Sequence, residues 1–135
     1  QIAQLCLAGK KDEAIALAKK MKEAWGDRFF LELQRAGRPS DEAVVRYHLS
    51  IADDCDIPVV ATHPIQFLEP QDFDAHDIRV CIARGEVLAD KSRPKLYSPE
   101  QYFKSPEEMI SLFADVPSAI ANTVEIAKRC NLEGV

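Results

Sequence analysis

The sequence has little glycine, few aromatic residues and no long hydrophobic run. Of its 135 residues, 5 are glycine and 7% are aromatic, while 47% are hydrophobic and 29% are charged. These proportions are typical of a globular domain and exclude a chain that is disordered throughout. No apolar stretch approaches the roughly 18 residues that span a bilayer, and no signal peptide pattern follows Gln1. We therefore expect one ordinary domain or a piece of one, with no membrane segment.

Cysteine motifs are missing as well. The four cysteines form no CxxC and no pair with histidine at zinc spacing; they are Cys6, Cys55, Cys81 and Cys130. Each lies in an apolar stretch with a helical pattern, where a free cysteine behaves as a small buried hydrophobe. We therefore expect free thiols and a cytoplasmic location. Because no initiator methionine is present, we also expect the chain to be cut from something longer.

The net charge is −5, which makes the chain as a whole a poor ligand for DNA phosphates. Basic residues nevertheless gather in one stretch: Arg84, Lys91, Arg93, Lys95 and Lys104. A solvated loop is the simpler interpretation of this stretch. Contact with a DNA backbone stays open as an alternative.

The first half of the chain alternates helical and strand patterns. Apolar spacing predicts helices over residues 1–8, 12–25 and 40–55, with Asp12 capping the second and Ser40 or Asp41 capping the third. The apolar runs Phe29–Leu33 and Ile57–Thr62 predict strands, and the second is apolar on both faces, as buried parallel strands are. A strand–helix–strand unit of this size implies parallel strands joined by a right-handed crossover.

Functional residues in such sheets usually follow the carboxyl ends of the strands. Those places are Gln34–Gly37 and His63–Phe67. On this ground His63 is a candidate functional residue, whereas His48, on the apolar stripe of a helix, is better interpreted as a core histidine.

The second half is more helical. Asp72 can cap a helix that runs to Arg84 and ends at Gly85. Ser98–Gln101 and Ser105–Glu108 are both capping boxes with proline at the first helical position, so each predicts the start of a helix. A last helix is predicted from Asp115–Pro117, and the longest irregular stretch is residues 90–97.

A cluster of three aspartates and one separate glutamate are candidate metal ligands. Asp72, Asp74 and Asp77 surround His76 and resemble a metal cluster, although acids in a first helical turn also favour the helix dipole. Glu32 stands in an apolar strand, where an inward carboxylate would need a partner or a metal and an outward one would be ordinary. Motifs for phosphate loops, dinucleotide binding, zinc proteases and serine hydrolases are missing.

Several phrases occur in an informative order. They are Phe29–Arg35, Ile57–Thr62, Asp72–Arg79, Tyr102–Met109, Leu112–Pro117 and Ala121–Cys130. Together they resemble the bacterial replicative DNA polymerase III alpha subunit family. The matching part is the C-terminal half of the N-terminal polymerase and histidinol phosphatase (PHP) domain.

The resemblance implies an α/β fold, as a helix-rich fragment of a distorted parallel β/α (PHP, TIM-like) barrel. Residues 1–135 would form a partial PHP domain, with a strand–helix–strand core over roughly 27–67 and a helical part over roughly 72–131. The palm and the other polymerase domains would lie outside the chain, and so would the Mg²⁺ that the palm binds.

The family's metal signature reads Ala-Thr-Asn-Asp-x-His-Tyr, and its Asp and His are ligands. Pro64 and Gln66 stand at those two positions here, with His63 in place of the Asn. Proline has no ligating side chain, and a neutral amide is a poor ligand for a zinc-like ion. The resemblance therefore implies a degenerate site with no metal, no cofactor and no catalytic residue in this chain.

The implied role is a non-catalytic scaffold in DNA replication. It would stabilise the polymerase and help to dock the proofreading exonuclease subunit, and it would meet primer-template DNA only through the parent. An alternative is a residual metal-dependent phosphoesterase or 3′–5′ exonuclease that uses Glu32, His63, Asp74 and His76. The other alternative is the DNA-backbone contact through Arg84–Lys104.

Overall fold

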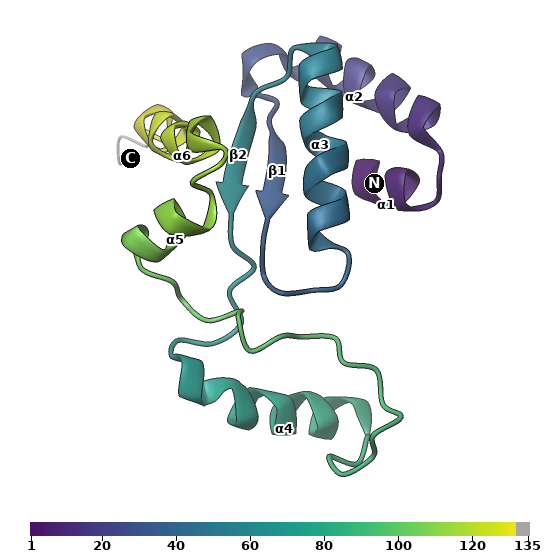
Figure 1. Cartoon of the computed structure of the whole chain (residues 1–135), viewed down its shortest axis with the longest axis vertical. Coiled ribbons are helices and arrows are strands. Elements are labelled where there is room, and N and C mark those ends of the chain that lie inside the picture. Colours follow the sequence, from purple (N-terminus) through teal and green to yellow (C-terminus); the bar gives the residue numbers. More distant parts are fainter. Residues whose placement is uncertain (132–135) are drawn as a thin grey trace.

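Two short parallel strands lie at the centre of the chain, with helices around them (Figure 1). The structure is a computed structural model that describes residues 1–131. Its elements are α1 (Ile2–Leu7), α2 (Lys11–Trp25), η1 (Gly26–Arg28), β1 (Leu31–Gln34), α3 (Asp41–Cys55), β2 (Val59–Thr62), η2 (Pro70–Asp72), α4 (Phe73–Arg84), α5 (Pro106–Leu112) and α6 (Pro117–Arg129). The predicted α/β class is therefore confirmed, in a helix-rich form.

The predicted parallel strand–helix–strand unit is also confirmed. β1 pairs with β2 in parallel, with Leu31 opposite Val59 and Leu33 opposite Ala61. These four side chains point to one face of the sheet because paired residues of parallel strands share a face. All four are at most 7% exposed and join one hydrophobic core with Ile51 and other residues of α3. Burial of this apolar face holds the sheet against the helix.

Side chains from two helices bond to the outer edges of this small sheet. Leu31 N–H donates to the Pro58 carbonyl, so the alternate residues Glu32 and Val59 turn their carbonyls outward. His48 Nδ1 of α3 lies 2.7 Å from the Glu32 carbonyl, and Asn122 Nδ2 of α6 donates to the Val59 carbonyl over 2.8 Å. Each edge thus has one carbonyl satisfied by a helix instead of by a third strand.

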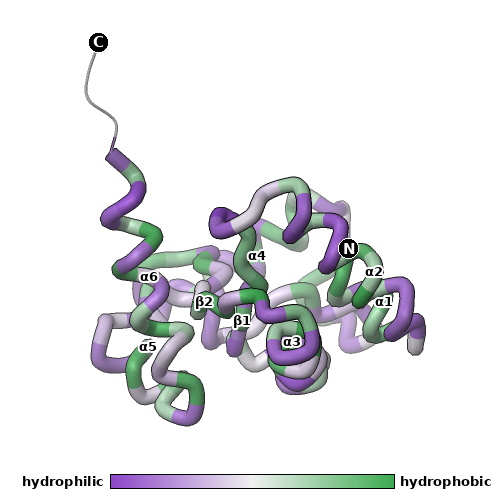
Figure 2. Tube along the Cα trace, turned by 90° about the horizontal axis from the view of Figure 1, so that it is seen from above, coloured by the Kyte–Doolittle hydropathy of each residue, from purple (hydrophilic) through white to green (hydrophobic). Residues whose placement is uncertain are grey.

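The helices fall into three groups around the sheet. α3 packs beside β1 with α1 and α2 beyond it, and α6 lies on the β2 side (Figures 1 and 2). α4 lies apart, beyond the carboxyl ends of the strands (Figure 1). Its glycine cap Gly85 adopts a φ of 66°, as predicted for a helix end at that position. None of the helices within residues 1–131 has the length and hydropathy to cross a membrane.

Several predicted helix caps are wrong in detail. α2 begins at Lys11 after Lys10, so Asp12 lies inside its first turn. Ser40 and Asp72 occupy the positions before α3 and α4, but neither side chain bonds to its own helix. Cys130 is exposed, whereas the other three cysteines are buried as predicted.

Only one of the two predicted capping boxes begins a helix within the described residues. Ser105 accepts from the Glu108 N–H, and Glu108 bonds back to the Ser105 N–H, at the start of α5. No helix follows Ser98, so that prediction is wrong. Residues 98–101 instead make turns that bond to the end of the sheet, as described next.

Candidate functional site

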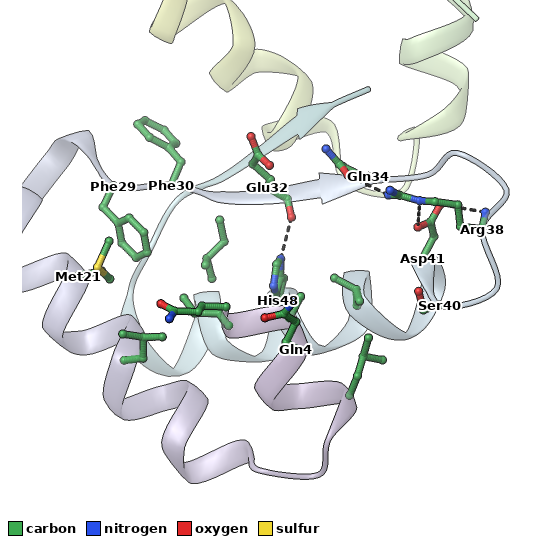
Figure 3. A pocket seen from close by; sticks show the side chains of 17 residues that line it. Gln4, Met21, Phe29, Phe30, Glu32, Gln34, Arg38, Ser40, Asp41 and His48 are labelled. Atoms are coloured by element: carbon green, nitrogen blue, oxygen red, sulfur yellow. Dashed lines mark hydrogen bonds and ion pairs between the residues drawn. The ribbon is translucent and has the colours of Figure 1, made fainter. Parts of the chain in front are cut away.

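Hydrogen-bonded polar side chains join the carboxyl ends of the two strands to the first turn of α3. Figure 3 shows the part of this network formed by Gln34, Arg38 and Asp41. Gln34 Nε2 donates to Thr62 Oγ1 over 3.0 Å, and Gln34 Oε1 accepts from Arg38 Nη2 over 2.9 Å. Arg38 Nε in turn donates to Asp41 over 2.8 Å. Gln34 lies in the predicted functional stretch Gln34–Gly37, and Thr62 is the last residue of β2, directly before the other stretch. The sequence does not single out Arg38.

Asp41 anchors this network from the first turn of α3. Its side chain is 8% exposed and accepts from the backbone N–H groups of Ala36, over 2.7 Å, and Arg38, over 3.2 Å. With the Arg38 side chain included, Asp41 accepts three hydrogen bonds. The carboxylate therefore fixes the turn between β1 and α3 rather than standing free for catalysis.

The chain's own backbone closes the carboxyl edge from the other side. We call residues 98–102 the covering segment. The Ser98 hydroxyl donates to the Ala36 carbonyl, Gln101 Nε2 donates to the Pro64 carbonyl over 2.9 Å, and Gln66 N–H donates to the Gln101 carbonyl over 2.8 Å. Ser98 and Gln101 are 9% and 2% exposed. Space that a ligand would use in other α/β proteins is thus filled by protein.

His63 is part of this closure. Its Nε2 lies 2.8 Å from the Glu100 carbonyl, and because a carbonyl can only accept, Nε2 carries the hydrogen. Nδ1 is shielded from solvent and has no partner among the described residues. Burial lowers the pKa of His63, and the positive charges of Lys104 and Arg38 lower it further. The folded protein therefore favours the neutral imidazole of His63 over the charged form.

Stability will therefore depend on His63 as the pH falls. A histidine whose pKa is lowered by folding contributes stability that is present above its unfolded pKa, about 6.5, and lost as the pH drops toward the folded value. Thermal unfolding between pH 8 and pH 5 will show a lower melting temperature on the acid side. In His63→Gln, which keeps a donor but cannot titrate, that loss will be smaller over the same range. Equal loss in both proteins would contradict this assignment.

Pro64 and Gln66, which the sequence analysis predicts to be degenerate ligand positions, have structural contacts of their own. Pro64 accepts a hydrogen bond through its carbonyl, and Gln66 is exposed and pairs through its backbone. The alternative ligands lie on different elements: Glu32 is exposed on β1, Asp74 is exposed on α4, and His76 is a half-buried residue of α4. Within residues 1–131, no group of three or more His, Cys, Asp or Glu side chains is placed to hold a metal ion. The structure thus does not assemble the alternative metal site.

His76 belongs instead to an aromatic cluster. Its ring centroid lies 5.4 Å from that of Phe67 and 4.9 Å from that of Tyr97. The neighbouring Asp77 takes two hydrogen bonds from Arg93, and Arg93 lowers the pKa of that carboxyl. Asp77 therefore holds Arg93 against α4, whereas Asp72 accepts from the Glu69 N–H and Asp74 is exposed.

The basic stretch is less solvated than predicted. The Arg93 side chain is 3% exposed, and Lys104 is 6% exposed with its Nζ 2.8 Å from Glu100. Lys104 also lies 3.8 Å from the centroid of the Tyr102 ring. The prediction of a solvated loop is wrong for these two residues. Arg84, Lys91 and Lys95 remain exposed, so contact with a DNA backbone stays an alternative for these three residues.

A groove of about 580 Å³ runs along the outer edge of β1; we call it the β1 groove. Phe29, just before β1, lines it together with Met21 and other side chains of α1, α2 and α3 (Figure 3). The backbone of Glu32 faces it as well. His48 is 8% exposed there, as predicted for a core histidine. With Nδ1 donating to Glu32, its Nε2 is left without a partner among the described residues.

The curated relatives of the chain agree on one kind of protein. The chain is 45% identical over 133 residues to the DNA polymerase III subunit alpha of Pseudomonas aeruginosa, covering 98% of the chain and 11% of the relative. It is 51% identical over 121 residues to the subunit of Escherichia coli (strain K12), and the match covers 90% of the chain and 10% of that relative. It is 52% identical over 127 residues to the subunit of Neisseria meningitidis serogroup A, and the match covers 93% of the chain and 11% of that relative. No protein-family profile matches the chain.

Similarity across nearly the whole chain defines it as a segment of a DNA polymerase subunit. The chain belongs to the DNA polymerase III alpha subunit family. It spans about one tenth of the length of the curated relatives it matches.

Proposed function

We propose that the chain is a non-catalytic scaffold within a replicative DNA polymerase. In this proposal the parent protein performs template-directed DNA synthesis in the cytoplasm, with its Mg²⁺ in a palm domain elsewhere. The chain contributes part of a PHP domain, with a core over roughly 27–67 and a helical part over roughly 72–131 in a distorted parallel β/α barrel. It meets primer-template DNA through the parent.

One observation carries the scaffold role: the carboxyl edge of the strands is closed by the protein itself. Pro64 stands at a former ligand position, and its carbonyl is taken by Gln101. The covering segment bonds to the chain just past both strands, where parallel sheets usually hold their ligands. This closure supports a scaffold role, since catalytic metal sites keep a coordination position open.

The scaffold's partner, in this proposal, is the proofreading exonuclease subunit. Holding the exonuclease on the polymerase raises its local concentration at the primer end, so editing need not await diffusion. A rigid body with a fixed surface is suited to this task, and the polar networks around Asp41 and the covering segment supply that rigidity.

A calorimetric titration of the folded chain with the exonuclease subunit from the same source tests the proposal. We expect saturable binding with a stoichiometry close to one. Cooperative thermal unfolding of the chain under the same conditions is the control. A cooperatively folded chain that binds no exonuclease would contradict the docking role.

A further inference from the structure

A second groove, of about 1200 Å³, lies between α5, α6 and residues 102–106; we call it the α5–α6 groove. Its large apolar side chains are open to solvent: Phe103 is 63% exposed, Ile110 is 55% exposed and Val124 is 52% exposed. Single exposed apolar residues are ordinary, but several gathered on one hollow mark an interaction surface. Two helices that line a hollow suit a third helix, which can lay its apolar face between them.

The charge beside this groove is negative. Glu69 and Glu108 line the groove, and Glu107 is exposed in the first turn of α5. The cation among the lining residues, Lys104, has a side chain that is 6% exposed and lies 2.8 Å from the Glu100 carboxylate. Complementary charge therefore favours a helix that carries cations beside its apolar side chains.

The chain itself carries a helix of this kind, α4. Ile78 and Ile82 lie one turn apart and share a face of α4, and they are 45% and 75% exposed. Val87 follows the end of the helix and is 69% exposed. None of the residues that line the groove belongs to α4, which lies apart from α5 and α6 in the fold (Figure 1). The groove of one copy is thus not filled by its own α4.

The other side of α4 faces its own chain. His76 contacts the Tyr97 ring, and Asp77 pairs with Arg93. Successive residues of a helix are turned by about 100°, so the two isoleucines lie on the side opposite to His76 and Asp77. The apolar face of α4 can therefore meet another molecule while the contacts with residues 93–97 stay in place.

Cations accompany this outward face. Arg79 and Lys91 are exposed, and the Lys95 side chain is 64% exposed. Residues 73–97 hold five basic and four acidic residues, a net charge of +1, whereas the whole chain carries −5. The remaining residues therefore carry −6. Approach of the α4 region to the groove of another copy brings opposite charges together, whereas approach of two grooves brings like charges together.

We propose that the α5–α6 groove of one copy takes the α4 helix of a second copy, with Ile78 and Ile82 as the apolar anchors. The two surfaces differ, so the contact is heterologous: each copy offers one groove and one helix, and copies add head to tail. This inference goes beyond the proposed function and does not depend on it, because both surfaces belong to the described part of the chain.

Analytical ultracentrifugation of the chain over a range of concentrations tests the contact. The average mass will rise with concentration, and less so as ionic strength rises. Ile82→Glu places a charge on the helix face and Ile110→Glu places one in the groove, so each will weaken association at least about 30-fold. Leu7→Glu is the matched control, since Leu7 is 49% exposed on α1, on the β1 side of the sheet. It will associate within about twofold of the unchanged chain, and circular dichroism will show all three variants folded.

A mixture of the two variants tests the head-to-tail arrangement. Ile82→Glu keeps an intact groove and Ile110→Glu keeps an intact α4, so an equimolar mixture retains one complete contact. It will form a complex of two copies that does not grow further. A chain that stays monomeric up to about 1 mM would overturn the proposal. Association that either variant leaves unchanged, or a mixture that stays monomeric, would overturn it as well.

Discussion

Replacing Phe113 with alanine will lower the free energy of unfolding by about 3–5 kcal/mol. Phe113 is 0% exposed and heads the largest fully buried side chains of the described residues. It lies where α5 ends, in the core shared with β1, β2 and α6. Removal of the ring deletes buried apolar contacts and leaves a cavity that rigid neighbours fill only in part.

Urea unfolding followed by circular dichroism measures this loss. Phe103→Ala is the matched control, because the same atoms are removed from a side chain that is 63% exposed. It will change the free energy of unfolding by no more than about 0.5 kcal/mol. Similar losses in the two variants would show that Phe113 is not part of the core as described.

Removing the Phe113 ring will also remove a contact of the Arg35 guanidinium, which forms an ion pair with Asp115. The Arg35 guanidinium lies 5.1 Å from the Phe113 ring centroid and pairs with Asp115 over 2.6 and 2.9 Å. Arg35 also donates to the Leu112 carbonyl, so it joins the end of β1 to the α5–α6 turn. Asp115, predicted to begin the last helix, makes this pair instead, which raises the pKa of Arg35 above its ordinary value.

Replacing Asp41 with alanine will lower the free energy of unfolding by about 3 kcal/mol. The carboxylate accepts from two backbone N–H groups, and one of them belongs to Ala36, which is 0% exposed. Without an acceptor the Ala36 N–H is buried unpaired, which costs about 1–3 kcal/mol. The partly buried Arg38 N–H also loses its acceptor. The Arg38 side chain also loses its anchor.

Asp41→Asn is the control, because the amide keeps one acceptor oxygen. It will cost less than the alanine variant in the same urea experiment. Amide hydrogen exchange supplies a second measurement, since the Ala36 N–H will exchange faster in Asp41→Ala. Equal stabilities of the unchanged chain and Asp41→Ala would contradict the assigned role.

Local patterns predict the helices well, but not the ends of the strands. Phe29–Leu33 predicts a strand from Phe29, whereas β1 begins at Leu31. Pro58 explains the difference. It has no N–H, so it cannot donate to the Phe29 carbonyl, which would be the preceding rung of the parallel ladder. A strand boundary thus depends on a residue of the partner strand, 29 positions away in the case of Phe29 and Pro58.

The closure of the carboxyl edge could be predicted only in part. Its place follows from the strand order, and Pro64 and Gln66 are visible in the sequence. The covering segment is not, because its local pattern is that of a helix start. Ser98 and Gln101 do exchange a bond typical of a capping box, from the Ser98 N–H to Gln101 Oε1 over 2.9 Å. The Ser98 hydroxyl, however, bonds to Ala36, and that long-range contact replaces the helix.

The side chains at the two sheet edges have a consequence for the chain at high concentration. An open strand edge can seed fibrils by pairing with another molecule. With the Glu32 carbonyl held by His48 and the Val59 carbonyl held by Asn122, an incoming strand would have to displace a helix-borne side chain at either edge. Self-assembly by strand addition is thereby slowed, so a sheet of only two strands can persist in concentrated solution.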